Sequence, residues 1–142
     1  MHSLRTKTLF IMGLFYAYAV FNPAIAGGMQ VNPGLWETKS QVTSPGGTQE
    51  NISQDCIEES EISPEKMMDE NQGCKVTDSS VDSNSMQWSI ACSNEGISMT
   101  GSGHAESSGD SIVGGMAIKA NFGGQEFLMD TKWEGKRIGA CE

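Results

Sequence analysis

Residues 85–92 have the sequence SMQWSIAC, in which every second side chain from Met86 to Cys92 is apolar. A period of two places these side chains on one face of an extended strand. The polar cluster SNEG follows at residues 93–96, and such clusters are typical of tight turns between antiparallel strands. The stretch therefore predicts a strand with one buried face, followed by a hairpin turn.

The same pattern continues toward the C-terminus. Residues 97–105, 112–120 and 127–133 carry an apolar side chain, a threonine or a glycine at every second position, separated by the clusters SSGD and NFGG. We therefore predict a meander of four consecutive strands. Centring each turn on its polar cluster predicts two cross-strand rows: Trp88, Gly101, Met116 and Met129 in one, and Ile90, Met99, Ile118 and Phe127 in the next.

The first half of the chain is less regular. Residues 35–43 and 49–56 favour two strands joined by a Pro-Gly-Gly turn, and residues 75–81 favour another. Val76 and Val81 have opposite parity within that last strand, which predicts a bulge or a register shift. Ser63 and Pro64 are typical of a helix N-cap and first position, so we expect one short helix there.

Together these elements predict an all-β fold, a single antiparallel meander of about seven strands with one short helix. Sequential hairpins favour a strongly coiled sheet or partial barrel. A two-sheet β-sandwich is the alternative architecture.

Residues 1–26 have the features of a secretory signal peptide. Arg5 and Lys7 precede an uncharged apolar stretch that is too short for a membrane-spanning helix, and Ala24 and Ala26 are the small residues that signal peptidase requires. We expect cleavage after Ala26, export to the periplasm, and a single domain over residues 27–142 that is not integral to a membrane.

Cleavage would remove two basic residues, leaving seven against eighteen acidic ones and changing the net charge from −9 to −11. Such a negative charge argues against nucleic acid and anionic membrane surfaces as partners. All four cysteines lie in the exported part, which predicts two disulfides. Three pairings are possible, and we favour Cys56 with Cys74 and Cys92 with Cys141.

The residues needed for catalysis and metal binding are scarce in the exported part. His104 is its single histidine, no tyrosine is present, and Gly101-Ser102-Gly103 lies within a predicted strand rather than a nucleophile elbow. The cysteines lack Cys-x-x-Cys spacing, and the acidic stretch from Glu58 to Glu70 lacks a calcium-loop pattern. We therefore expect no enzyme activity, cofactor or metal site.

Methionines provide the most suggestive pattern. Met86, Met99, Met116 and Met129 occur once per predicted strand and share the inward parity. Flexible thioethers fill irregular cores and also line adaptable apolar pockets. We hypothesise that a small apolar ligand binds a surface lined by Trp88, Met99, Met116, Phe127 and Met129.

Two other functions are compatible with this sequence. The first is a structural or interaction protein of the cell envelope with a solid core, whose outer strand faces contact a partner. The second is copper(I) binding by the clustered thioethers, which are soft ligands. The basic pair Lys136-Arg137 suits either a grip on an anionic group or, in the interpretation we favour, a structural role near Cys141.

Several motifs resemble those of an exported bacterial family, domain of unknown function 3617. They are the sequence NPGLWE at residues 32–37, the order of the four cysteines, GCKV at residues 73–76, and the ending WEGKRIGAC at residues 133–141. The resemblance covers essentially the whole exported part and implies a Gram-negative periplasmic setting. It implies no activity, substrate or catalytic residue.

Overall fold

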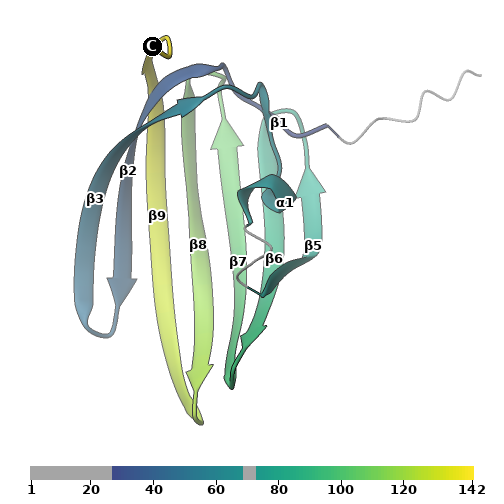
Figure 1. Ribbon diagram of the computed structural model, residues 1–142, viewed down its shortest axis with the longest axis vertical. Helices are drawn as coiled ribbons and strands as arrows, with labels where there is room; N and C mark the ends of the chain where they lie inside the picture. Colours follow the sequence, from purple (N-terminus) through teal and green to yellow (C-terminus); the bar gives the residue numbers. More distant parts are fainter. Residues whose placement is uncertain (1–26, 69–72) are drawn as a thin grey trace, which may run out of the picture.

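The computed structural model describes residues 27–68 and 73–142, so the predicted signal peptide lies outside the described residues. The main structure is a sheet of long strands (Figure 1). Its seven strands are β2 (Gly34–Ser44), β3 (Gly47–Ile57), β5 (Cys74–Val81), β6 (Ser85–Asn94), β7 (Ile97–Ser107), β8 (Ser111–Phe122) and β9 (Gln125–Gly139).

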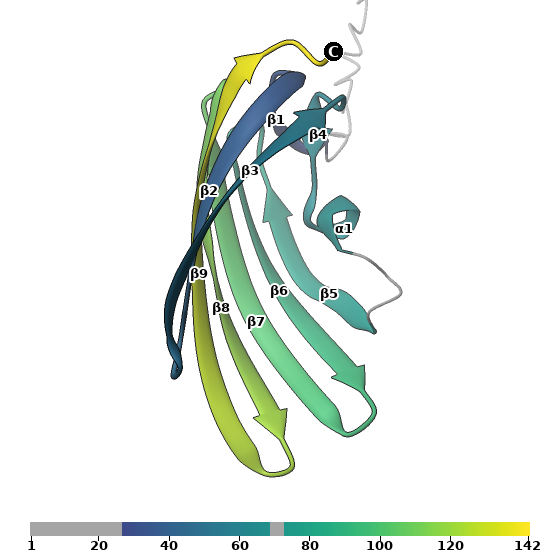
Figure 2. The same cartoon turned by 60° about the vertical axis from the view of Figure 1, so that its left-hand side comes forward.

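The seven strands are all antiparallel and follow the order β3-β2-β9-β8-β7-β6-β5. The five consecutive strands β5 to β9 thus form a meander. The N-terminal hairpin, β2 and β3, joins this meander because β2 pairs with β9. The sheet is strongly curved and stays open, with β3 and β5 at its edges (Figure 2). The coiled antiparallel sheet with one short helix is confirmed, whereas the sandwich alternative is wrong because the second sheet contains two strands of only two residues each.

The hairpin turns correct the predicted register. Trp88 pairs with Gly103, Gly103 with Met116, and Met116 with Thr131, so every predicted pairing in the meander is displaced by two residues. The β6–β7 and β8–β9 loops contain two residues each, Glu95-Gly96 and Gly123-Gly124, all with positive φ. Such tight loops match the twist of antiparallel strands. Each turn centre lies one residue later than the centre of its polar cluster.

Two local predictions are confirmed. The β5–β6 pairing shifts register between Val76 and Asp78, which accounts for the opposite parity of Val76 and Val81. Helix α1 (Pro64–Met67) begins at the expected place, with Pro64 in its first turn. The Ser63 hydroxyl accepts a hydrogen bond from the Lys66 amide, as an N-cap should.

A short strap covers one end of the concave face of the sheet. It consists of three short elements: β1 (Met29–Gln30), β4 (Glu61–Ile62) and α1. β1 pairs with β4. The Gln30 carbonyl accepts a 2.6 Å hydrogen bond from the Ser107 hydroxyl, and the Gln30 amide donates to the Ser83 carbonyl. Met29 is fully buried as a result.

Tryptophans lie over glycines on the concave face. The Trp88 indole occupies the space in which a side chain of Gly103 would stand, and Trp133 does the same over Gly114. The two indoles approach each other, with ring centroids 6.3 Å apart. A strand glycine covered by an aromatic ring leaves room for the sheet to coil, so these pairs account for the concavity.

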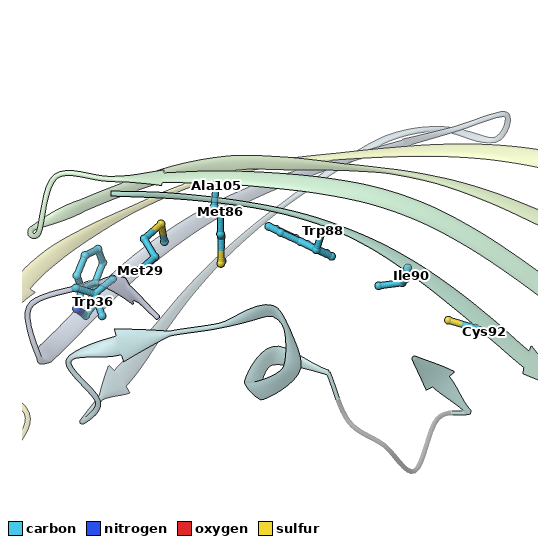
Figure 3. Close-up of a cluster of buried hydrophobic side chains, with 8 residues drawn as sticks. Met29, Trp36, Met86, Trp88, Ile90, Cys92 and Ala105 are labelled. Carbon is cyan, nitrogen blue, oxygen red and sulfur yellow. The ribbon is translucent and has the colours of Figure 1, made fainter. Parts of the chain in front are cut away.

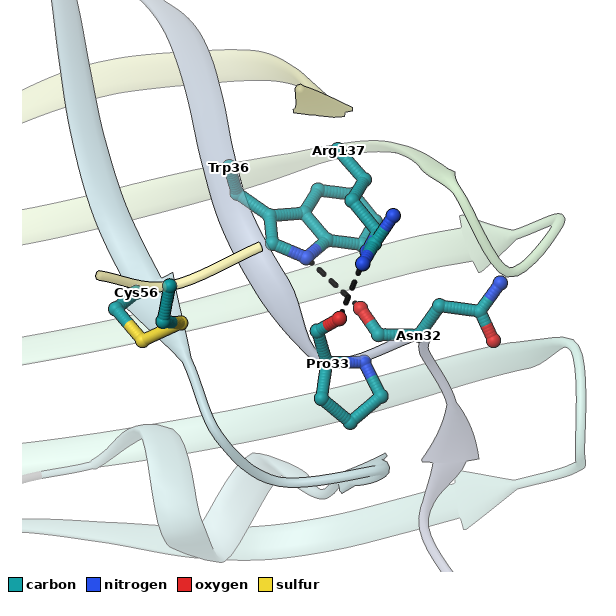
Figure 4. Close-up of a disulfide and its surroundings, with 6 residues drawn as sticks. Asn32, Pro33, Trp36, Cys56 and Arg137 are labelled. Carbon is teal, nitrogen blue, oxygen red and sulfur yellow. Dashed lines mark hydrogen bonds between the residues drawn. A yellow bond between two sulfur atoms is a disulfide. The ribbon is translucent and has the colours of Figure 1, made fainter. Parts of the chain in front are cut away.

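The two end motifs meet in space. Trp36 of β2 lies opposite Arg137 of β9. Both side chains donate hydrogen bonds to backbone carbonyls of Asn32 and Pro33, the bend that precedes β2 (Figure 4). The Trp36 indole donates to the Asn32 carbonyl at 3.0 Å, while Arg137 Nε donates to the Pro33 carbonyl at 2.7 Å. The structural interpretation of Arg137 is therefore supported.

The disulfides differ from the favoured pairing. Cys56 is bonded to Cys141, and Cys74 to Cys92. The first joins β3 to the end of the chain, beside the β2–β9 pairing, and the second links directly opposite residues of β5 and β6. The predicted pairs were wrong because they assumed that the irregular segment between Cys56 and Cys74 forms its own closed loop. Strand pairing instead brings Cys74 to Cys92.

Replacing Gly103 with alanine should test the tryptophan–glycine contact. The new methyl group would overlap the Trp88 ring, so we expect a loss of about 1–3 kcal/mol in the free energy of unfolding. Urea denaturation measures it. Gly139→Ala is the matched control, because no atom lies within 4 Å of its added carbon. Equal losses in both variants would contradict the proposed role of the contact.

Removing the disulfides one at a time should give unequal losses of stability. Cys56 and Cys141 are 85 residues apart, against 18 for Cys74 and Cys92. Loop-closure entropy then predicts losses of about 4.5 and about 3 kcal/mol for the two double alanine variants. Chemical denaturation checks the order, and a larger loss for the Cys74–Cys92 variant would refute this explanation.

Candidate functional site

The two faces of the meander differ sharply in charge. In β7, in β8 and in β9 as far as Glu134, every charged or titratable side chain has the outward parity: His104, Glu106, Lys119, Glu126, Asp130, Lys132 and Glu134. Arg137, near the end of β9, has the inward parity. Up to this point the concave side of these strands bears apolar side chains, threonine and glycine, with Ser107 and Gln125 at the strand ends. An uncharged concave surface within an acidic protein is the feature most suited to binding an apolar group.

The five predicted lining residues lie on this concave face, in three consecutive cross-strand rows. Trp88 shares a row with Met116, Met129 lies in the next, and Met99 shares the third with Phe127. Their burial differs: Trp88 is only 3% exposed, the three methionines are half-buried, and Phe127 is 37% exposed. The structure thus brings the five together on an open surface rather than around an enclosed cavity.

We divide the concave face into a covered half and an open half. The covered half lies beneath the strap, around Met86 and Trp133. The open half extends along β7, β8 and β9 to the hairpin tips, and Figure 2 shows that β1, β4 and α1 lie over the other end. The apolar side chains of the open half are Ile97, Met99, Met116, Ile118, Phe122, Phe127 and Met129.

A small apolar cavity lies in the covered half. Its volume is about 140 Å³, and its walls come from the strap, from β2 and from the meander. Sequence reasoning missed the strap's contribution, Met29 and Met67, because the short segments around them show no periodicity. Three of the lining residues, Met29, Trp36 and Met86, lie together in Figure 3, and Trp88 lies farther along β6.

The indole nitrogen of Trp88 is buried and has no hydrogen-bond partner in the described part of the chain. It lies over Gly103, at the boundary between the covered and the open half. A buried N–H group without a partner costs free energy. A bound molecule that placed an acceptor atom against this buried nitrogen would remove that cost.

The methionine sulfurs do not form an evident metal centre. Met86, Met116, Met129 and Met99 occupy four different cross-strand rows, so none lies directly opposite another. Among residues 27–68 and 73–142, no group of three or more His, Cys, Asp or Glu side chains is placed to hold a metal ion. No observation favours copper(I) over core packing.

His104 lies on the convex face, as its parity predicted. The imidazole leans over Gly115, with Cε1 3.3 Å from the position of an added Cβ, at the edge of a hollow of about 500 Å³. Lys39, Lys132 and Glu134 also border this hollow. Within the described residues, the His104 side chain has no hydrogen-bond or ion-pair partner that would activate it as a base.

These features define a class of protein: a disulfide-linked, open antiparallel sheet with a largely uncharged concave face, half of which a strap covers. Residues 31–141 match the family described as protein of unknown function (DUF3617), and the chain belongs to this family. No curated protein and no solved structure matches it. In the described residues, no helix is long and apolar enough to cross a membrane.

The strap depends on a carboxylate. Glu61 accepts hydrogen bonds from the Gln30 side chain at 2.8 Å and from the Gly28 amide at 3.3 Å. These bonds, and to a smaller extent the charge of Lys66, hold the pKa of Glu61 below its ordinary value. The ionised form therefore stabilises the contact between the two ends of the strap.

Acidification should loosen the strap. Because folding lowers this pKa, the stabilisation is complete above the ordinary value of about 4.5 and is lost as pH falls through the lowered value. Amide hydrogen exchange at Val31, whose N–H donates to the Ser60 carbonyl, reports how often the strap opens. The protection factor is compared between the native chain and Glu61→Gln at each pH. We expect greater protection in the native chain at neutral pH and convergence at low pH. A difference that stays constant with pH would contradict the role of Glu61.

Proposed function

We propose that this chain is an exported, periplasmic, non-enzymatic protein that binds a small apolar ligand on the concave face of its sheet. The signal peptide is cleaved after Ala26, and the two disulfides are compatible with an oxidising compartment. The observation that carries the proposal is the open half, an uncharged apolar surface that is continuous with the covered core.

The shape of this surface favours an elongated ligand. Successive rows are two residues apart along each strand, so the surface from the Trp88 row to the Phe122 row extends roughly 20 Å. A hydrocarbon chain laid along it would contact Met99, Met116 and Met129, whose flexible thioethers adapt to different shapes. Each methylene group buried there contributes about 0.8 kcal/mol.

Trp88 supplies a single polar contact in this surface. Its unpaired N–H is at the inner end of the open half, where it can donate to an oxygen of the ligand. Apolar sites commonly combine a large hydrophobic lining with a few polar groups that fix orientation. We therefore propose a ligand with an apolar chain and one hydrogen-bond acceptor, such as a fatty acid.

Filling the surface tests the proposal. Met116→Trp places a larger side chain in the row of Trp88, so we expect at least about tenfold weaker binding of a fluorescent fatty acid, measured by titration without lipid vesicles. Ala117→Trp is the matched control, because it adds a bulky group to the adjacent convex position. Equal affinities in native protein and Met116→Trp would refute the site.

An absence of any binding to the native protein would support the alternative of a solid-core interaction protein.

Nuclear magnetic resonance of the indole N–H groups adds a second readout. The Trp88 signal, identified by its loss in Trp88→Phe, should shift with a fatty acid and shift less with an alkane. The Trp36 signal serves as internal reference, since its N–H is already bonded to Asn32.

A further inference from the structure

The tip of the β8–β9 hairpin exposes three large apolar side chains within seven residues. Phe122 is 43% exposed, Phe127 is 37% exposed and Leu128 is 59% exposed. The two phenyl rings contact each other edge to face, with centroids 5.7 Å apart. Figures 1 and 2 show this tip at the end of the sheet opposite the C-terminus. A concentrated apolar patch at a protruding position marks a contact surface.

The tip is also electrically neutral within a strongly acidic chain. Residues 117–129 contain one basic and one acidic side chain, Lys119 and Glu126, which form an ion pair at 3.0 Å. The whole chain carries a net charge of −9. Transfer of this tip into an apolar medium would therefore not bury an unpaired charge.

Apolar side chains lie on both faces of the hairpin. Phe122 and Phe127 extend the concave face, whereas Leu128 has the opposite parity and lies on the convex face beside Lys119. The backbone is closed by the two-residue turn Gly123-Gly124, which leaves few amide groups unpaired. A protein partner docked against one face would cover only one of these surfaces, but insertion into a lipid layer surrounds both.

We propose that the tip of the β8–β9 hairpin inserts into the interface of a zwitterionic lipid bilayer. Phenylalanine and leucine are favoured at the boundary between headgroups and acyl chains. The negative charge of the chain selects against anionic lipid, so the attraction comes from the apolar side chains. The tip shares Phe122 and Phe127 with the outer end of the open half. The inference does not require that a ligand binds.

Sedimentation with sucrose-loaded phosphatidylcholine vesicles tests this proposal. Native protein should partition onto the vesicles at both low and high salt, because burial of apolar groups is insensitive to screening. The double variant Phe122→Ser, Phe127→Ser should partition at least about tenfold less. Leu128→Ser should also reduce partitioning, by about threefold or more, if both faces are immersed.

Ile138→Ser is the matched control, because this 47% exposed side chain lies near the other end of β9 and should leave partitioning unchanged. Phe122→Trp gives a second measurement, which does not depend on whether the serine variants are stable. Brominated phosphatidylcholine should quench its emission more strongly than that of the native protein.

Several results would overturn the proposal. They are no partitioning of the native protein, equal partitioning of the double variant, binding only to phosphatidylglycerol vesicles at low salt, or no effect of Leu128→Ser, which would indicate docking by one face. The fatty-acid titration without vesicles is independent of all of them, so a failure of either proposal is recognised separately.

Discussion

Trp88 lies over Gly103 and Trp133 over Gly114, and the shape of the sheet depends on these two contacts. A side chain at either glycine would lift the indole from the sheet and crowd the concave face. With the indoles in place, the sheet coils enough to shelter Met86 and Ala105 beneath the strap. The curvature that forms the core also shapes the open half, so stability and the proposed binding surface have one origin.

The sequence predicted which side chains share a face but not which ones are neighbours. Alternation in residues 85–92 is enforced by burial on one side, so the parity of Met86 and Trp88 follows directly. Register depends on the turn, and Glu95 with positive φ shortens the loop in a way that a polar cluster does not reveal. An error of one residue in a turn centre displaces the pairing by two.

The candidate site was predictable to a similar extent. The concave methionines could be assigned from parity alone, whereas the strap could not, because Met29 lies in a two-residue strand without periodicity. The disulfides were mispaired since Cys141 meets Cys56 only after β2 and β9 align, a long-range event. The apolar tip gave a visible signal, NFGGQEFLM at residues 121–129, but its meaning depended on exposure, which sequence does not give.

The pairing of β2 with β9 governs the order in which the molecule can assemble. The bond from Arg137 to the Pro33 carbonyl joins residues 104 positions apart, and the last cysteine completes the disulfide beside it. The N-terminal hairpin therefore has no sheet to join until the C-terminal strand has emerged. Under the export proposed above, a chain that crosses the membrane unfolded could not complete this fold midway, and the topology would keep it unfinished until translocation ended.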